Sequence, residues 1–239
     1  MAKVPRLRMF AGPNGSGKST IKEIIPIKIL GVYLNADDIE KQLRETPQFD
    51  FSVYDSHIDA DAFLDFLSHH QRITIDPEYL SIQGTLLDCS KISIDSYFAS
   101  TLVDFLRIEL LRLKKSFTFE TVMSHQSKVE FLQLAQQQGY RTYLYYIATI
   151  DPEINVSRVQ YRVQTGGHAV ARDKIIKRYY NSLELLIDAI FAADRAFIFD
   201  NSSDGGQHAF LCEINAGQEL VLQADTVPQW FQHYVLQRF

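Results

Sequence analysis

The stretch "AGPNGSGKST" (residues 11–20) is the most informative segment of the sequence. From Gly12 to Ser19 it matches the phosphate-loop (Walker A) pattern G-x-x-x-x-G-K-[ST] without a mismatch. Glycines let successive backbone N–H groups turn toward phosphate oxygens, and a helix that starts directly after the loop adds the positive end of its dipole. We therefore predict a nucleoside triphosphate site. The loop residues expected to contact the nucleotide are Gly12, Pro13, Asn14, Gly15, Ser16, Gly17, Lys18, Ser19 and Thr20.

Two side chains of this loop have expected roles. Lys18 would reach the β- and γ-phosphates, and the Ser19 hydroxyl would be a ligand of Mg²⁺. The alternative is a glycine-rich turn with a chance Lys-Ser pair. The apolar strand-like segment before the loop (6–11) and the helical segment after it favour the phosphate loop.

The rest of the chain alternates between strand-like and helical segments, which predicts an α/β fold. We expect a P-loop nucleoside triphosphate hydrolase or kinase fold, with a parallel five-stranded core sheet flanked by helices. The expected strands are 6–11, 31–35, 116–122, 140–150 and 195–200. The expected helices are 18–29 (bent or ended at Pro26), 36–44, 96–115, 124–138 (capped by Ser124 and ended by Gly139), 152–164 and 174–193.

A length of 239 residues fits one domain, 1–239, with two elaborations. Residues 46–95 form an insertion in which 49–70 suggest one helix and 72–94 alternate as strands or loops do. Residues 204–239 form a C-terminal β-hairpin, with its turn near Ala216 and Gly217, and a short helix.

The composition excludes several classes of protein. A net charge of −5 without a long basic run argues against a dedicated nucleic-acid surface. Two cysteines without metal-ligand spacing argue against a disulfide scaffold or a structural zinc site. Neither a signal peptide nor an apolar stretch of membrane-spanning length is present, so we expect a cytoplasmic protein without a membrane partner.

Acidic residues follow two of the expected strands. Asn35, Asp37 and Asp38 come after 31–34, at the strand end where ligands gather in open α/β sheets. A carboxylate there could take the proton of an attacking hydroxyl, whereas the alternative role is helix N-capping. Glu120 lies in an otherwise apolar strand beside the hydroxyl of Thr121, and we favour a functional role for it over the alternative, a solvated sheet edge.

A basic segment surrounds the Gly-Gly pair at 166–167. Two helices joined by such a loop are typical of a lid that closes over phosphates, although a solvated amphipathic pair is the alternative. Beyond the lid, His168 could contact substrate, and Asn201 could shape the nucleotide pocket or only make a turn. The candidate lid arginines are Arg158, Arg162, Arg172 and Arg178.

Taken together, these segments resemble the zeta-toxin family of P-loop small-molecule kinases. The resemblance covers 7–45 and roughly 97–203, with "ETV", "DPEIN" followed by "RV", and "GGH" in the same order. It implies an adenylate-kinase-like core, ATP and Mg²⁺ as cofactors, and an antitoxin protein as a partner. The best-known members phosphorylate the 3′-hydroxyl of the sugar in UDP-N-acetylglucosamine. The resemblance makes Asp37 the general base and places Glu120 and Thr121 near the acceptor.

The chain departs from the family pattern at Asn35, which replaces an acid, and at Ala171, where a proline is expected. The function predicted is therefore an ATP-dependent phosphotransferase acting on a small-molecule hydroxyl, of which a nucleotide sugar is one candidate. The alternatives are a nucleoside or nucleotide kinase, and an ATP-binding module that switches a protein partner.

Overall fold

The chain folds as two compact units, Met1–Gly31 with Thr118–Phe239, and Val32–Phe117. The computed structural model describes residues 4–70, 75–165, 167, 169–203 and 208–239. The single domain over 1–239 stays a prediction.

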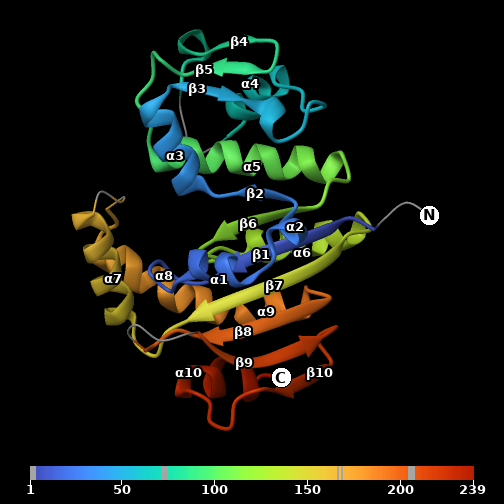
Figure 1. Cartoon of the computed structure of the whole chain (residues 1–239), viewed down its shortest axis with the longest axis vertical. Helices are drawn as coiled ribbons and strands as arrows, with labels where there is room; N and C mark the ends of the chain where they lie inside the picture. The colour runs from blue at the N-terminus through green and yellow to red at the C-terminus, as the bar shows by residue number, and fades with distance from the viewer. Residues whose placement is uncertain (1–3, 71–74, 166, 168, 204–207) are drawn as a thin grey trace. The chain divides into compact units, whose positions relative to one another are not determined.

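The first unit is built on a mostly parallel sheet, as the sequence predicts (Figure 1). Strand β1 pairs in parallel with β7, and β7 with β8, whereas β8–β9 and β9–β10 are antiparallel. The C-terminal hairpin is therefore not a separate appendage, because β9 extends the core sheet. The strands, in the order β10-β9-β8-β7-β1-β6, are Glu219–Leu222, Ala209–Asn215, Arg195–Asp200, Arg141–Ala148, Arg6–Ala11 and Phe117–Thr121.

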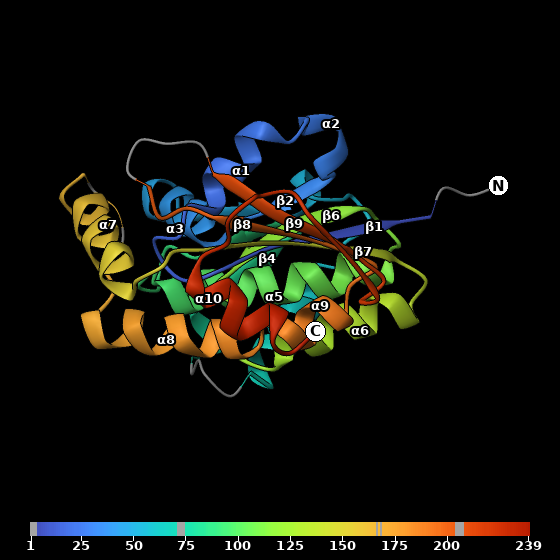
Figure 2. The same cartoon turned by 90° about the horizontal axis from the view of Figure 1, so that it is seen from below.

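Helices cover both faces of this sheet. Figure 2 shows α1 and α2 over one face and α6, α8 and α9 over the other. Ile21 of α1 packs on Ile147 and Phe199 of the sheet. The helices are α1 (Lys18–Ile24), α2 (Ile27–Leu30), α6 (Ser127–Gln137), α7 (Pro152–Gln164), α8 (Arg172–Glu184), α9 (Leu186–Phe191) and α10 (Gln229–Phe231), which continues as a π-helical turn (Gln232–Leu236).

Local chemistry explains several of these boundaries. Asp151 caps α7 by accepting a hydrogen bond from Glu153 N at 2.8 Å, and Gly139, with φ 80°, follows the end of α6. Ala216 and Gly217 both have positive φ, 51° and 62°, which is the conformation of a type I′ hairpin turn. The predicted helix start at Pro152, the helix stop at Gly139 and the hairpin turn near Ala216 and Gly217 are confirmed.

Two predicted boundaries are wrong. Helix α6 begins at Ser127 and is not capped by Ser124; the His125 Nδ1 accepts from Ser127 N at 3.2 Å and takes the place of a cap. The helix expected over 174–193 begins two residues earlier and divides at Leu185, where α8 ends and α9 begins.

The second unit packs around aromatic side chains. Phe51 contacts Phe63 and Phe105 with ring centroids 5.7 and 5.6 Å apart. A small antiparallel sheet, in the order β3-β5-β4, lies within the same unit. The described elements of the second unit are β2 (Val32–Leu34), α3 (Ala36–Glu45), β3 (Gln48–Asp50), α4 (Asp61–Ser68), β4 (Ser81–Gln83), β5 (Leu86–Asp88), α5 (Ser96–Arg112) and two 3₁₀ turns (Phe51–Val53 and Pro77–Tyr79).

The single helix expected over 49–70 is wrong in its first half, where a strand and a 3₁₀ turn replace it. Asp50 favours the turn because its carboxylate accepts from Ser52 N at 2.9 Å. Of the strands or loops expected over 72–94, two short strands form, β4 and β5. Among the described residues, no helix combines the length and the apolar character needed to cross a bilayer.

A partly exposed ion-pair cluster around Asp55 in the second unit leads to a prediction about acid stability. Asp55 binds Lys115 at 2.6 Å and His57 at 2.8 Å, and these partners hold the pKa of its carboxyl below the ordinary value. The stabilisation is therefore complete above the unfolded pKa, about 4, and is lost as pH falls through the folded value. We expect Asp55→Asn to lower the free energy of unfolding by about 1 kcal/mol at pH 7.

Urea unfolding at pH 7 and pH 2.5 tests this expectation, since the difference from wild type should shrink at the lower pH. Asp65→Asn is the matched control, because its pair with His69 joins two exposed side chains. An Asp55 effect that is equal at both pH values would contradict the assignment.

Candidate active site

The phosphate loop connects β1 to α1 and is held in a conformation that requires its glycines. Gly12, Gly15 and Gly17 have φ of 144°, 73° and 93°, all in the region that favours glycine. The surroundings leave no room for side chains either. A Cβ on Gly15 would lie 2.6 Å from Asn155 O, and one on Gly12 would collide with Ile147 O. The backbone of the loop is therefore packed tightly against the start of α7 and the end of β7.

We expect Gly12→Ala to destabilise the protein by about 3 kcal/mol or more, because it combines an unfavourable φ with a backbone collision. Gly139→Ala is the matched control. Gly139 also has positive φ (80°), but nothing lies within 4 Å of a Cβ built there. The control should cost roughly 1–2 kcal/mol, the strain of the φ angle alone. Urea unfolding measures the free energy of unfolding of both variants. Equal losses would show that the tight packing at Gly12 does not contribute to stability.

Lys18 and Ser19 lie where the motif requires. The Lys18 ammonium donates to Gly12 O and Pro13 O, both at 2.9 Å, so its charge lies across the loop. The exposed Ser19 hydroxyl donates to Glu120 Oε2 at 3.3 Å. Glu120 is half-buried at the end of β6, and it brings a carboxylate beside the hydroxyl expected to bind Mg²⁺. The neighbouring Thr121 hydroxyl accepts from Met123 N at 3.1 Å and supports the turn after the strand.

The loop also has the polar groups that a triphosphate needs. The Ser16 hydroxyl is fully buried and has no hydrogen-bond partner within the described part of the chain. A Cβ placed on Gly12 would come within 2.9 Å of this hydroxyl, so the hydroxyl lies inside the curve of the loop. A buried hydroxyl without a partner is costly unless a ligand satisfies it. The loop residues therefore fit a phosphate group.

Besides Glu120, the side chains of Asn155, Asn201 and His208 contact the loop within the described part of the chain, and of these three only Asn201 was a predicted site residue. Asn155 donates to Asn14 O at 2.6 Å, and Asn201 donates to Ser16 O at 2.8 Å. His208 Nε2 lies 2.8 Å from the Thr20 hydroxyl. The Asn201 amide contacts the loop backbone, and its role in shaping the nucleotide pocket stays a prediction. The contacts of Asn155 and His208 with the loop could not be predicted from local sequence, because their partners are more than 140 residues away in the chain. Asn155 lies in the "DPEIN" segment, and His208 lies in no recognised motif.

The candidate lid helices α7 and α8 pack against each other through their own apolar cluster, which includes Val156, Val159 and Ile175. Both views place them side by side (Figures 1 and 2). Arg172 forms an ion pair with Glu153 and so links the two helices. His168 lies outside the described residues.

The other three candidate arginines differ in their surroundings. Arg158 donates to Asn201 O at 2.8 Å. Arg162 and Arg178 are half-buried on α7 and α8, respectively. The structure thus brings Arg158 to the backbone beside the phosphate loop, and it gives Arg172 a carboxylate partner.

In the second unit, Asn35 is the cap of α3, since its Oδ1 accepts from Asp37 N at 2.9 Å. The alternative role of Asp37 and Asp38 as caps is therefore wrong; both are exposed in the first turn of the helix. Burial, and then the Asp38 charge, raise the pKa of Tyr54 to about 12. The Asp38 charge thus helps to raise the pKa of a tyrosine in the same unit.

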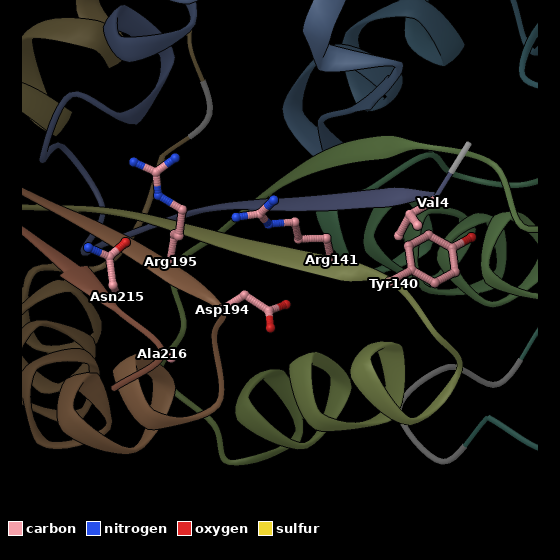
Figure 3. Close-up of a pocket in the computed structure, with 7 residues that line it drawn as sticks. All are labelled: Val4, Tyr140, Arg141, Asp194, Arg195, Asn215 and Ala216. Carbon is pink, nitrogen blue, oxygen red and sulfur yellow. The ribbon is translucent and has the colours of Figure 1, made fainter. Parts of the chain in front are cut away.

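A cavity of about 390 Å³ lies at the opposite end of the core sheet, where β7 and β8 begin (Figure 3). Its charged groups take part in the fold. Arg195 pairs with Glu213, and Asp194 accepts from Thr142 N at 2.7 Å. The cavity lies away from the strand ends that carry the phosphate loop, so it has no place in the candidate site. It is lined by Val4, Tyr140, Arg141, Asp194, Arg195, Asn215 and Ala216.

Fold and loop define an α/β protein of the P-loop kinase type. A family model for zeta toxin matches residues 70–204, and the chain belongs to the zeta-toxin family. A curated relative, an uncharacterized protein of Haemophilus influenzae, is 35% identical over 63 residues, 26% of this chain and 45% of that protein. The chain thus matches less than half of this relative's length.

Solved structures share the fold at low sequence identity. A chain of the AvrRxo1-ORF1:AvrRxo1-ORF2 complex with sulphate ions aligns with a TM-score of 0.56 and 15% identity, over 93% of this chain and 62% of that one. The same complex with ATP aligns with a TM-score of 0.53 and 13% identity, over 93% and 61%. The PezAT chromosomal toxin–antitoxin system of Streptococcus pneumoniae aligns with a TM-score of 0.53 and 17% identity, over 100% and 81%.

Proposed function

We propose that this protein is an ATP-dependent phosphotransferase that transfers the γ-phosphoryl group of ATP to a hydroxyl of a small molecule. The observation that carries the proposal is the phosphate loop with Lys18 across it and the Ser19 hydroxyl beside the Glu120 carboxylate. A carboxylate beside the Ser19 hydroxyl fits a site that would hold Mg²⁺ together with the triphosphate. Membership of the zeta-toxin family and the ATP complex of a fold neighbour support ATP as the donor.

The donor half of the reaction belongs to the loop. Backbone N–H groups and the buried Ser16 hydroxyl bind phosphate oxygens, and Lys18 moves from the loop carbonyls to the β- and γ-phosphates. Ser19 would hold Mg²⁺, which neutralises phosphate charge when bound. Arg162 and Arg178, together with Arg172 after release from Glu153, are the candidates for stabilising charge on the transferring group.

The acceptor half belongs to the acidic residues. Asp37 takes the proton of the attacking hydroxyl, as its exposed position and the separate Asn35 cap allow. Asn35, Asp38, Glu120, Thr121 and His168 are proposed acceptor contacts. A nucleotide sugar such as UDP-N-acetylglucosamine is the proposed acceptor class, on the basis of family membership.

Incubation of the protein with ATP, Mg²⁺ and a metabolite extract tests this function. Mass spectrometry should detect a new phosphorylated species whose formation stops with Lys18→Ala. Purified UDP-N-acetylglucosamine, other nucleotide sugars and nucleosides then identify the acceptor class. ATP hydrolysis without any phosphorylated product would count against the kinase.

A second candidate function is favoured by two fold neighbours, the AvrRxo1-ORF1:AvrRxo1-ORF2 structure and the PezAT toxin–antitoxin system. In this reading the chain acts as a toxin whose partner is an antitoxin. Growth arrest on induced expression, relieved by Lys18→Ala, would tie toxicity to the ATP site. A complex that forms only with nucleotide, without a phosphorylated metabolite, would favour a switch over a kinase.

A further inference from the structure

We propose that helix α7 sets the conformation of the phosphate loop through two of the loop's carbonyl groups, with Asn155 and Arg158 as positioning residues. This proposal rests on the proposed function, because it concerns how the same loop is prepared for ATP. It assigns a role to Asn155, which no phosphate-loop motif includes, and it changes the expected role of Arg158.

The first carbonyl is Asn14 O. The Asn155 side chain is fully buried, donates to this carbonyl at 2.6 Å through Nδ2 and accepts from the Thr149 hydroxyl through Oδ1. A carbonyl oxygen can only accept, so the amide nitrogen must face Asn14. Thr149 is also fully buried. The Asn155 amide is thereby fixed at both of its ends.

The second carbonyl is Ser16 O, and α7 reaches it through an intermediate. Asn201 Nδ2 donates to Ser16 O, and the Arg158 guanidinium donates to Asn201 O, both at 2.8 Å. The Asn201 backbone N–H donates to Ala148 O at 2.8 Å, which anchors this residue to the sheet. Arg158 follows Asn155 by three residues, so the two contacts come from one face of α7.

Holding these two carbonyls from outside the loop has a direct consequence for the intervening backbone. Its curve is fixed, with the Ser16 N–H donating to Pro13 O at 3.2 Å within it, and phosphate binds on the inner side of that curve. The close approach of Gly15 to the Asn155 backbone fixes the distance between loop and helix. An arginine that donates to Asn201 O in this way acts on the loop through the backbone that follows β8.

The same contacts reach the next helix. The Tyr179 hydroxyl of α8 donates to Thr149 O at 2.6 Å, and the Thr149 side chain holds Asn155. One buried chain of hydrogen bonds therefore links α8, the end of β7, α7 and the loop. Phosphate binding at the loop and the placement of the arginine-bearing helices thus depend on the same few residues.

Asn155→Asp tests the proposal, since aspartate keeps the shape but cannot donate to Asn14 O. Titration calorimetry with ATP and Mg²⁺ should give an affinity at least about tenfold weaker than that of wild type. The ³¹P resonance of the β-phosphate of bound ADP should move toward its position in free ADP, a change that general loss of stability would not produce. The matched control is Asn181→Asp, the same change at an exposed position of α8, which should bind ATP as wild type does.

Thermal unfolding without nucleotide shows whether each variant is folded. If Asn155→Asp does not fold, Thr149→Val removes the hydroxyl that orients the Asn155 amide while keeping the volume, and a several-fold loss of ATP affinity is expected. ATP binding by folded variants within twofold of wild type would overturn the proposal. Absence of ATP binding by the wild-type protein itself would instead overturn the proposed function.

Discussion

Replacement of Lys18 by alanine is expected to reduce phosphoryl transfer by about 10²–10³-fold. The Lys18 ammonium lies across the phosphate loop, 2.9 Å from both Gly12 O and Pro13 O. When triphosphate enters, this charge can pass from two neutral carbonyls to phosphate oxygens, which form stronger, charge-assisted hydrogen bonds. Charge on the phosphoryl group is redistributed during transfer, so loss of the lysine should lower the turnover rate as well as the affinity for ATP.

Single-turnover measurements with labelled ATP separate the two effects, once an acceptor has been found. Lys22→Ala is the matched control, because Lys22 lies one turn further along α1 and outside the motif. Both variants should unfold at similar temperatures without nucleotide, since Lys18 is only half-buried. A Lys18→Ala protein that keeps a third or more of the wild-type rate would exclude the loop as the transfer site.

The part of this site that the sequence predicts is the part made by neighbouring residues. The strand, glycine loop and helix from Arg6 to Ile24 form one local unit, so a short motif contains nearly all the information needed. The helix start at Pro152 and the hairpin turn near Gly217 are local in the same sense. Each depends on the preferences of two to four adjacent residues, and tertiary contacts do not override them.

Contacts between distant segments could not be predicted in this way. Nothing in "DPEIN" says that the Asn155 amide meets a carbonyl 141 residues earlier. Arg158 is a related case, because basic residues around a Gly-Gly pair indicate a lid from charge alone. Its hydrogen bond to Asn201 O depends on where β8 ends. The prediction of one helix over 49–70 was wrong for another reason. The spacing of the aromatic residues in this segment fits a helix as well as it fits the strand and turn that form.

Asp37→Asn is expected to reduce transfer by about 10²–10⁴-fold, the contribution of a positioned general base, while ATP affinity stays near that of wild type. The structure removes the main alternative role of this carboxylate. Asn35 caps α3 through the Asp37 backbone N–H, which the substitution keeps, so the helix should form unchanged. The remaining structural cost is the loss of one negative charge at a helix N-terminus, about 0.3–1 kcal/mol.

Asp38→Asn is the matched control, because it removes the same charge from the same helical turn. It should have a smaller effect on transfer, and it should lower the pKa of Tyr54, which the Asp38 charge helps to raise. Ultraviolet titration of tyrosine measures the second effect and shows that the two carboxylates act on different groups. If Asp37→Asn transfers phosphate as fast as Asp38→Asn, neither is the base, and Glu120 beside Ser19 becomes the carboxylate to replace next.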